Sequence, residues 1–284
     1  MDRLYRIGIR QYTVIVGAHE GAVAAYLNNN WMPDVRVDLL VKFSVHSLPK
    51  LLQNIAKQHK EPFIICGYNC FTHSNFPESL INQHTLHPES LVLSATSKSL
   101  AQSRQHYFAV INERRVEKIS ELQNREQYSL SLCDFAVFGQ EAVDYLIRMD
   151  ESKLDAGYEW HTLNIAQDFL NNGGRGYIAE TAWTLQIEAD RDLLTLNRLL
   201  LDEGQDAHIL SEIPYTVQIT PPVRIDPQVS IGQGAKIGPH VYLERGSSVG
   251  HNVVLRDAII LARVNIPAQK NASGTIITTR GPIS

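Results

Sequence analysis

The 284-residue sequence predicts an α/β sheet domain followed by a short left-handed parallel β-helix. Two patterns indicate this fold class. In the first two thirds of the chain, short apolar runs typical of strands alternate with helical patterns, as they do in α/β sheets. Near the C-terminus, aliphatic residues recur every six positions, a period that neither a helix nor a flat strand produces. With 44% hydrophobic and 20% charged residues, the composition is that of a globular protein.

The elements of the α/β part follow one another along the chain, and an amphipathic helix at 190–204 closes this domain. A glycine cluster, Gly173, Gly174 and Gly176 with Arg175 among them, predicts a tight turn between a helix and the last strand, with Arg175 exposed. A phosphate-binding nest is the alternative interpretation of that cluster. The expected helices cover 19–30 and 48–58, and the expected strands cover 12–17, 35–41, 62–67, 90–96, 107–111, 128–138 and 181–187.

The six-residue period predicts stacked triangular coils, because one aliphatic residue per face points inward and a small residue fills the space beside it. Three six-residue units make one coil, so this run predicts between two and three coils, followed by an irregular tail. The predicted domains are therefore 1–205 for the α/β domain, 206–218 for a linker, and 219–284 for the β-helix and tail. The inward positions are Ile219, Ile225, Ile231, Ile237, Leu243, Val249, Leu255 and Leu261.

Charge and apolar patterning exclude several classes of partner. The net charge of −4 gives no basic surface for nucleic acid or anionic lipid. No apolar run approaches the ~20 residues of a membrane helix, and the N-terminus lacks a signal-peptide pattern. We therefore expect a cytoplasmic protein with no nucleic-acid and no membrane partner. Cys66, Cys70 and Cys133 form no C-x-x-C pair and are predicted to be core thiols.

Three segments resemble the sugar-phosphate nucleotidylyltransferases, the group that includes mannose-1-phosphate guanylyltransferase and the glucose-1-phosphate nucleotidylyltransferases. They are RLYRIGIRQYTVIVGAHEGAVAAYL, EPFIICGYNCFTHSNF and DRDLLTLNRLLL, and with the β-helix the resemblance covers nearly the whole chain. It implies a nucleotidyltransferase (Rossmann-like) sheet domain. In that family a nucleotidyl group passes to a sugar phosphate, and two carboxylates hold the divalent cation that bridges the phosphates.

The sequence departs from the family pattern at each catalytic motif. It begins after the family's first strand and its G-G-x-G-T-R-L loop, so the resemblance implies a sheet that lacks this strand. Tyr68 and Asn69 stand where the family has Gly-Asp, Gln186 stands where it has its second aspartate, and Glu121 is all that remains of its E-K-P segment. We therefore expect no catalytic residue and no metal ligand. The resemblance implies that these four residues line the old sugar-nucleotide cleft.

Two functions from different classes follow from these departures. The first is a non-catalytic structural or regulatory subunit, or a nucleotide-sugar-binding module, which forms a homo-oligomer or a hetero-oligomer with an active nucleotidyltransferase. It needs no cofactor, because neutral amides bind a nucleotide or nucleotide sugar without a cation. The alternative is an active sugar-1-phosphate nucleotidylyltransferase, completed by a partner or by a missing N-terminal segment. Only this alternative requires Mg²⁺.

Histidines offer two further hypotheses. His240 and His251 lie in the β-helix, where hexapeptide acyltransferases place a general base. The predicted coils are too few for that class, so both are expected on corners that face solvent. His73, His84 and His87, with Cys70 or His106, lack the paired spacing of a zinc site, and a metal is rejected.

Overall fold

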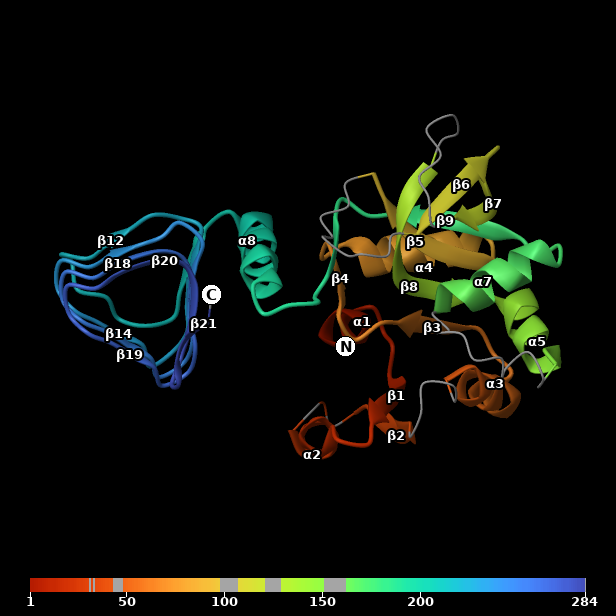
Figure 1. The fold of residues 1–284 in the computed structure, drawn as a ribbon, viewed down its shortest axis with the longest axis horizontal. Coiled ribbons are helices and arrows are strands. Elements are labelled where there is room, and N and C mark those ends of the chain that lie inside the picture. The colour runs from red at the N-terminus through yellow and green to blue at the C-terminus, as the bar shows by residue number, and fades with distance from the viewer. Residues whose placement is uncertain are drawn as a thin grey trace. The chain divides into compact units, whose positions relative to one another are not determined.

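The computed structural model describes residues 1–30, 32, 34–42, 48–97, 107–120, 129–150 and 162–283. It divides into two compact units, Met1–Thr184 and Leu185–Ser284, which we describe separately (Figure 1). No helix among the described residues is long and apolar enough to cross a membrane.

The first unit is built on a six-stranded sheet, which confirms the α/β prediction. The strand order is β7-β6-β8-β5-β9, and β3 pairs with one half of the long strand β8. Strands β5 and β9 are parallel, whereas β3, β5 and β6 each run antiparallel to β8. These strands are β3 (Phe63–Cys66), β5 (Leu91–Thr96), β6 (Phe108–Asn112), β7 (Arg115–Ser120), β8 (Ser129–Phe138) and β9 (Gly176–Glu180).

Helices cover both faces of this sheet. Side chains alternate between the faces of a strand, and in β5 the residues Leu91 and Leu93 join one buried cluster while Val92 joins the other. The first cluster packs against α3 (Leu48–His59), α5 (Gln140–Arg148) and α7 (Thr162–Asn171). The second packs against α4 (Phe76–Leu86). The sheet is therefore the middle layer of three.

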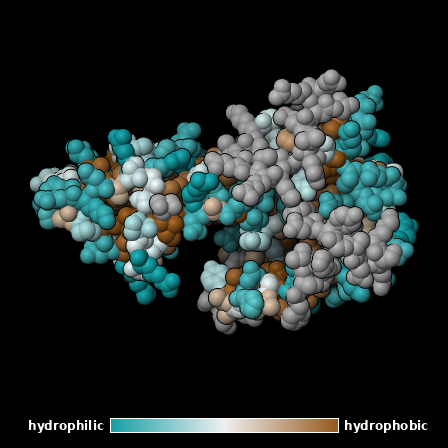
Figure 2. Space-filling model, in the orientation of Figure 1, coloured by the Kyte–Doolittle hydropathy of each residue, from teal (hydrophilic) through white to brown (hydrophobic). Residues whose placement is uncertain are grey.

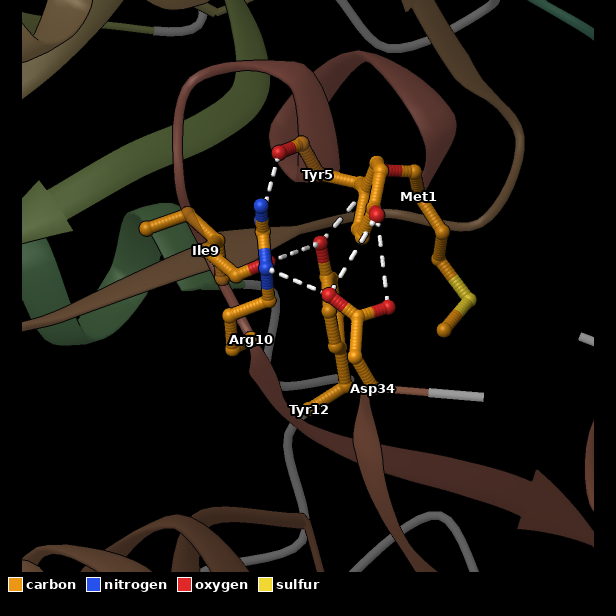
Figure 3. A network of polar contacts seen from close by, with 6 residues as sticks. All are labelled: Met1, Tyr5, Ile9, Arg10, Tyr12 and Asp34. Carbon is orange, nitrogen blue, oxygen red and sulfur yellow. Dashed lines mark hydrogen bonds and ion pairs between the residues drawn. The ribbon is translucent and has the colours of Figure 1, made fainter. Parts of the chain in front are cut away.

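The N-terminal segment forms a small structure of its own: α1 (Asp2–Arg6), β1 (Gln11–Gly17), α2 (Gly21–Asn30) and β2 (Arg36–Lys42). Strand β1 is parallel to β2, in a two-stranded sheet. A polar network anchors α1 to this sheet (Figure 3). The Arg10 guanidinium lies 4.0 Å from the centre of the Tyr5 ring, and its Nε is 3.2 Å from Oδ2 of Asp34.

The glycine cluster makes a turn between a helix and a strand as the sequence predicts, but the strand that follows is β9 and not the one predicted at 181–187. It joins α7 to β9, which begins at Gly176, directly after the turn. The Arg175 guanidinium is exposed and pairs with Glu141, Nη2 to Oε1 2.6 Å. A Cβ on Gly174 would lie 2.4 Å from the Phe169 ring, so this turn is closely packed. These contacts favour the structural role over a phosphate nest.

The second unit is a parallel β-helix preceded by α8 (Asp192–Gly204). Five strands stack on one face: β11 (Ala207–Ile209), β13 (Val223–Ile225), β16 (Val241–Leu243), β18 (Val254–Ile260) and β20 (Asn271–Thr278). A second face holds β12 (Gln218–Ile219) and β15 (Lys236–Ile237), with the first halves of β18 and β20. A third face holds β14 (Ser230–Ile231), β17 (Ser248–Val249) and β19 (Asn265–Ile266). The hairpin strand β21 (Gly281–Ile283) returns antiparallel on β20.

The β-helix has more coils than the two to three predicted. The C-terminal coils are hidden from the six-residue pattern because one repeat is a residue shorter than the others. Ile237 pairs with Leu255, eighteen residues on, but Leu243 pairs with Ile260, only seventeen on. Ile260, not Leu261, is therefore the inward residue, and it is fully buried. Residues with a positive φ mark the corners of the coils. They are six residues apart except Asn252 and Asp257, which are five apart. These residues are Gln228, Gly234, His240, Gly246, Asn252, Asp257, Arg263 and Gln269.

Beyond the shortened repeat the chain continues to coil. The segment expected to be an irregular tail forms β20, which pairs with β18 over both of its halves. At the other end, the segment expected to be a linker supplies β11 and the first residue of β12. The β-helix is therefore longer at both ends than the six-residue period indicates.

Helix α8 groups with the β-helix, whereas the sequence places it at the end of the α/β domain. Leu194 is buried against Ile259 and Ile276, which lie at corresponding positions of successive strands. Arg198 forms a two-pronged ion pair with Asp257, in which Nε to Oδ1 measures 2.5 Å. The helix thus covers an apolar column on the outside of the coils, and this burial fixes its place.

Candidate functional site

The loop between β3 and β4 (Cys70–Thr72) holds two of the predicted ligand residues, Tyr68 and Asn69. Tyr68 is 92% exposed, and Asn69 is half-buried. The start of the loop is tied to β8, because the Gly67 N–H donates a hydrogen bond of 2.7 Å to the Asp134 carbonyl oxygen. A second backbone bond, from Cys70 N–H to the Gly67 carbonyl at 3.3 Å, closes the turn. The backbone thus holds the exposed Tyr68 ring at the end of an edge strand.

Asp134 supplies a carboxylate beside this loop. A Cβ on Gly67 would lie 2.8 Å from Asp134 Oδ2, so the glycine lets the carboxylate approach the backbone. No motif in the sequence predicts Asp134 as a site residue. Its neighbour Phe135 pairs with Cys66, and this pairing between distant strands could not be read from the local sequence.

Ser94 of β5 is a buried polar residue that contacts β8 next to the strand position of Asp134. It is completely buried, and its hydroxyl donates to the Phe135 carbonyl oxygen at 2.5 Å. The Ser94 hydroxyl oxygen also lies 2.6 Å from the Cys133 sulfur. The pairing of β5 with β8 shifts register between Leu93 and Ala95, at the position of Ser94. The hydroxyl thus bonds the β8 backbone where the regular ladder is interrupted.

For the other two predicted ligand residues, Gln186 and Glu121, a place beside this loop stays a prediction. Gln186 is half-buried at the end of β10 (Thr184–Gln186), and it belongs to the second compact unit. Glu121 lies outside the described residues, as does His106. Tyr68 and Asn69 therefore define the candidate site, with Asp134 beside them.

All three cysteines lie around this loop, although only Cys133 is the core thiol that the sequence predicts. Cys66 is exposed and Cys70 is half-buried, because they end β3 and begin β4 at the sheet edge. The Cys70 thiol hydrogen-bonds to the Cys133 thiol, and that bond and burial raise the pKa of Cys70 far above its usual range. Burial of the Cys66 sulfur raises the pKa of that thiol to about 11, although the nearby N-terminal amino group lowers it.

The histidines near this region make aromatic contacts. The His87 ring stacks on Tyr177 with centroids 3.6 Å apart, and His73 lies edge-on to Trp183 at 6.4 Å. Burial lowers the pKa of His84, which favours its neutral form. Within the described parts of the chain, no three His, Cys, Asp or Glu side chains are grouped so that they could hold a metal ion.

In the second unit, His240 lies at a corner as predicted, but its side chain is only 25% exposed because it has a partner. Its Nε2 lies 2.7 Å from Oδ1 of Asp202 on α8, and its carbonyl oxygen accepts a bond of 3.1 Å from Asn197. His251 is exposed at a corner, as expected. Both contacts of His240 are to residues of α8, so this histidine helps to hold the helix on the coils. That structural role argues against a general base at His240.

Comparisons with known proteins agree with this architecture. Residues 219–284 match the family model described as the GMPPB C-terminal domain. The structure resembles the inositol-1-phosphate CTP transferase from T. maritima, with a TM-score of 0.56 and 12% identity over 72% of this chain and 81% of that one. It also resembles a protein from Bacillus anthracis assigned as a glucose-1-phosphate thymidylyltransferase, solved with sucrose, with a TM-score of 0.57 and 14% identity over 69% of this chain and 78% of that one. Among curated protein sequences, none matches the chain.

The chain therefore has the nucleotidyltransferase fold, an α/β sheet unit followed by a β-helix. Its C-terminal part matches, in particular, the C-terminal domain of GMPPB. At 12% and 14% identity the two solved structures establish the fold and leave the activity to be argued from the site.

Proposed function

We propose that this protein is a non-catalytic nucleotidyltransferase-like subunit that binds a nucleotide or nucleotide sugar at the Tyr68–Asn69 loop. The observation that carries the proposal is Asn69 itself. An amide stands at the end of β3, where the resemblance places a metal-binding carboxylate. Metal-assisted nucleotidyl transfer needs anionic oxygen ligands for the cation. An amide provides neutral donors and an acceptor, which suit a base or a sugar.

The exposed Tyr68 ring supports ligand binding at this loop. With 92% of its surface accessible, it offers an aromatic face next to the Asn69 amide. An aromatic ring stacks on a nucleobase at a gain of about 1–3 kcal/mol. Since the loop backbone is bonded to β8 at Gly67, the segment that carries the ring is attached to the sheet. We infer that Tyr68 contacts the base and that Asn69 hydrogen-bonds to base or sugar.

The β-helix supports the proposed role as a subunit. Among the described strands, β11 pairs only with β13 and β19 pairs only with β17, so both lie at the ends of the stack. Strand edges of this kind require covering. Figure 2 shows hydrophobic residues within the outline of the coils and hydrophilic residues around the rim. We infer that the coil ends contact a second copy of this chain or an active nucleotidyltransferase.

Titration calorimetry with nucleotides and nucleotide sugars tests the binding function. We expect binding that is unchanged when EDTA replaces Mg²⁺, and about tenfold weaker binding in Asn69→Ala or Tyr68→Ala, about 1.4 kcal/mol. Tyr215→Ala is the matched control, since Tyr215 is 98% exposed in the other compact unit. Binding that requires Mg²⁺ contradicts the proposal.

A pyrophosphate-release assay separates this proposal from the active-enzyme alternative. The protein is supplied with each nucleoside triphosphate, Mg²⁺ and sugar 1-phosphates, and we expect no release above that of a buffer blank. Release that is lost on removing Mg²⁺ would identify an active nucleotidylyltransferase. Native mass spectrometry of the same preparation reports the assembly, and a strictly monomeric chain at micromolar concentration would overturn the homo-oligomer.

A further inference from the structure

The proposed function does not use the thiols that surround the candidate loop. Cys66, Cys70 and Cys133 come from three strands, β3, β4 and β8, and they are the only cysteines in the sequence. Cys70 packs against the buried cluster that contains Cys133, strands β4 and β8 are in contact, and the two thiols share a hydrogen bond. We propose that Cys70 and Cys133 are a redox pair, which a small-molecule disulfide oxidises to an intramolecular disulfide bond.

Strand geometry places these sulfurs on one side of the sheet. Cys133 and Phe135 are two residues apart in β8, so their side chains share a face. Both belong to the buried cluster on the α4 side of the sheet, and Cys70 packs against that cluster. Cys66 pairs with Phe135 across the β3–β8 ladder, which puts its side chain on the same face.

The surroundings distinguish the three thiols. Cys133 is buried, and the Ser94 hydroxyl, 2.6 Å from its sulfur, holds it in position. Cys66 is exposed, and its sulfur lies 3.7 Å from the Gly67 carbonyl oxygen. Cys70 is half-buried, so its exposure is less than that of Cys66 and greater than that of Cys133. A reagent from solvent therefore reaches Cys70 before Cys133. The Met1 amino group, Asp134 and the other thiols are the charged or titratable groups that act on Cys66 and Cys70.

The reaction is two successive thiol–disulfide exchanges. The Cys70 thiolate attacks one sulfur of a reagent such as oxidised glutathione, the reagent disulfide breaks, and one glutathione thiolate leaves. The Cys133 thiolate then attacks the Cys70 sulfur of the mixed disulfide, and the second glutathione leaves. Two protein thiols are oxidised, one reagent disulfide is reduced, and the two protons pass through water to the released thiolates. The new bond ties the end of the Tyr68–Asn69 loop to β8.

The raised pKa of the Cys70 thiol slows this exchange. Since the thiolate is the nucleophile, a thiol with a raised pKa reacts slowly at neutral pH. The full-length protein is therefore incubated with oxidised glutathione at pH 8.5, blocked with iodoacetamide and digested for peptide mass spectrometry. We expect a linked peptide pair that contains Cys70 and Cys133, with the loss of two hydrogen atoms, and Cys66 blocked by iodoacetamide or carrying glutathione.

Single-cysteine variants serve as matched controls. Cys66→Ser should form the linked pair as the wild type does, whereas Cys70→Ser should lose it completely. Peptide mapping of the wild type does not depend on the folding of any variant. A Cys66–Cys70 disulfide, a disulfide between two chains, or glutathione on Cys66 with both other thiols free would each overturn the proposal. The result is independent of nucleotide binding, so its failure leaves the proposed function standing.

Discussion

The two units of this protein reach a buried core by different routes. In the β-helix, each inward side chain lies above one about eighteen residues earlier, as in the pairs Ile225–Leu243 and Ile237–Leu255. In the α/β unit, the Ser94 hydroxyl donates a hydrogen bond near the candidate loop to the Phe135 carbonyl oxygen, and these residues are forty-one positions apart in sequence. A repeat thus distributes its stability over equivalent layers. A functional loop depends on a few contacts between distant strands.

The largest expected effect comes from interrupting a layer of the β-helix. Ile237 is 1% exposed, and Ile237→Asp would bury a charge without a partner among the coils. We expect a loss of about 4 kcal/mol or more in the free energy of unfolding of the second unit. The matched control is Lys236→Asp at the neighbouring outward position.

Guanidinium denaturation followed by far-ultraviolet circular dichroism measures both variants. The control should remain within about 0.5 kcal/mol of the wild type, because it changes an exposed side chain. Equal losses in the two variants would contradict the inward and outward assignment of these positions.

A smaller loss is expected when two coils are forced apart. A Cβ on Gly232 would lie 2.4 Å from the backbone nitrogen of His251 in the next coil, a distance that the backbone must relieve by moving. We expect Gly232→Ala to destabilise the second unit by about 3 kcal/mol. Gly204→Ala is the control, since no atom lies within 4 Å of its added Cβ. A Gly232→Ala variant as stable as the Gly204→Ala variant in thermal unfolding would show that the coils are spaced more widely.

The same contrast explains what the sequence could predict. The six-residue period identifies the β-helix, because each aliphatic position follows from the one before it. One shortened repeat after Leu255 hides Ile260 and the strands beyond it, since the inward frame moves by one residue.

At the candidate site, the family resemblance selected Tyr68 and Asn69, just after a predicted strand. It did not find Asp134, Ser94 or the contact of Cys70 with Cys133, because these neighbours depend on the pairing of β8 with β3 and β5. That pairing is set by burial over the whole sheet, which no short segment encodes.

Ion pairs on the two units should differ by less than the core changes. Arg198 and Asp257 join α8 to the coils, with side chains that are 47% and 19% exposed. A double-mutant cycle with Arg198→Ala and Asp257→Asn should give a coupling energy of about 1 kcal/mol, since water screens the exposed guanidinium.

Arg175 and Glu141 make a comparable pair on the α/β unit, with side chains 46% and 42% exposed. The corresponding cycle there should show no measurable coupling, because both groups are well solvated. Equal coupling energies in urea denaturation would mean that the docking of α8 adds nothing to its ion pair.

A last comparison concerns the reactivity of the Cys66 thiol in the folded and the unfolded chain. Cys66 is an exposed residue, but burial of its sulfur raises the thiol pKa to about 11, so the folded state retains the proton well above the usual range. The thiolate fraction, and with it the rate of alkylation by iodoacetamide, should rise about tenfold per pH unit between pH 8 and 10. In urea the same peptide should react faster and level off near pH 9, because an unfolded cysteine has a pKa of about 8.5. Quantitative mass spectrometry of the Cys66 peptide measures both curves. If the folded protein also levels off near pH 9, the Cys66 sulfur is fully solvated, and the strand edge next to the candidate loop is more open than the structure shows.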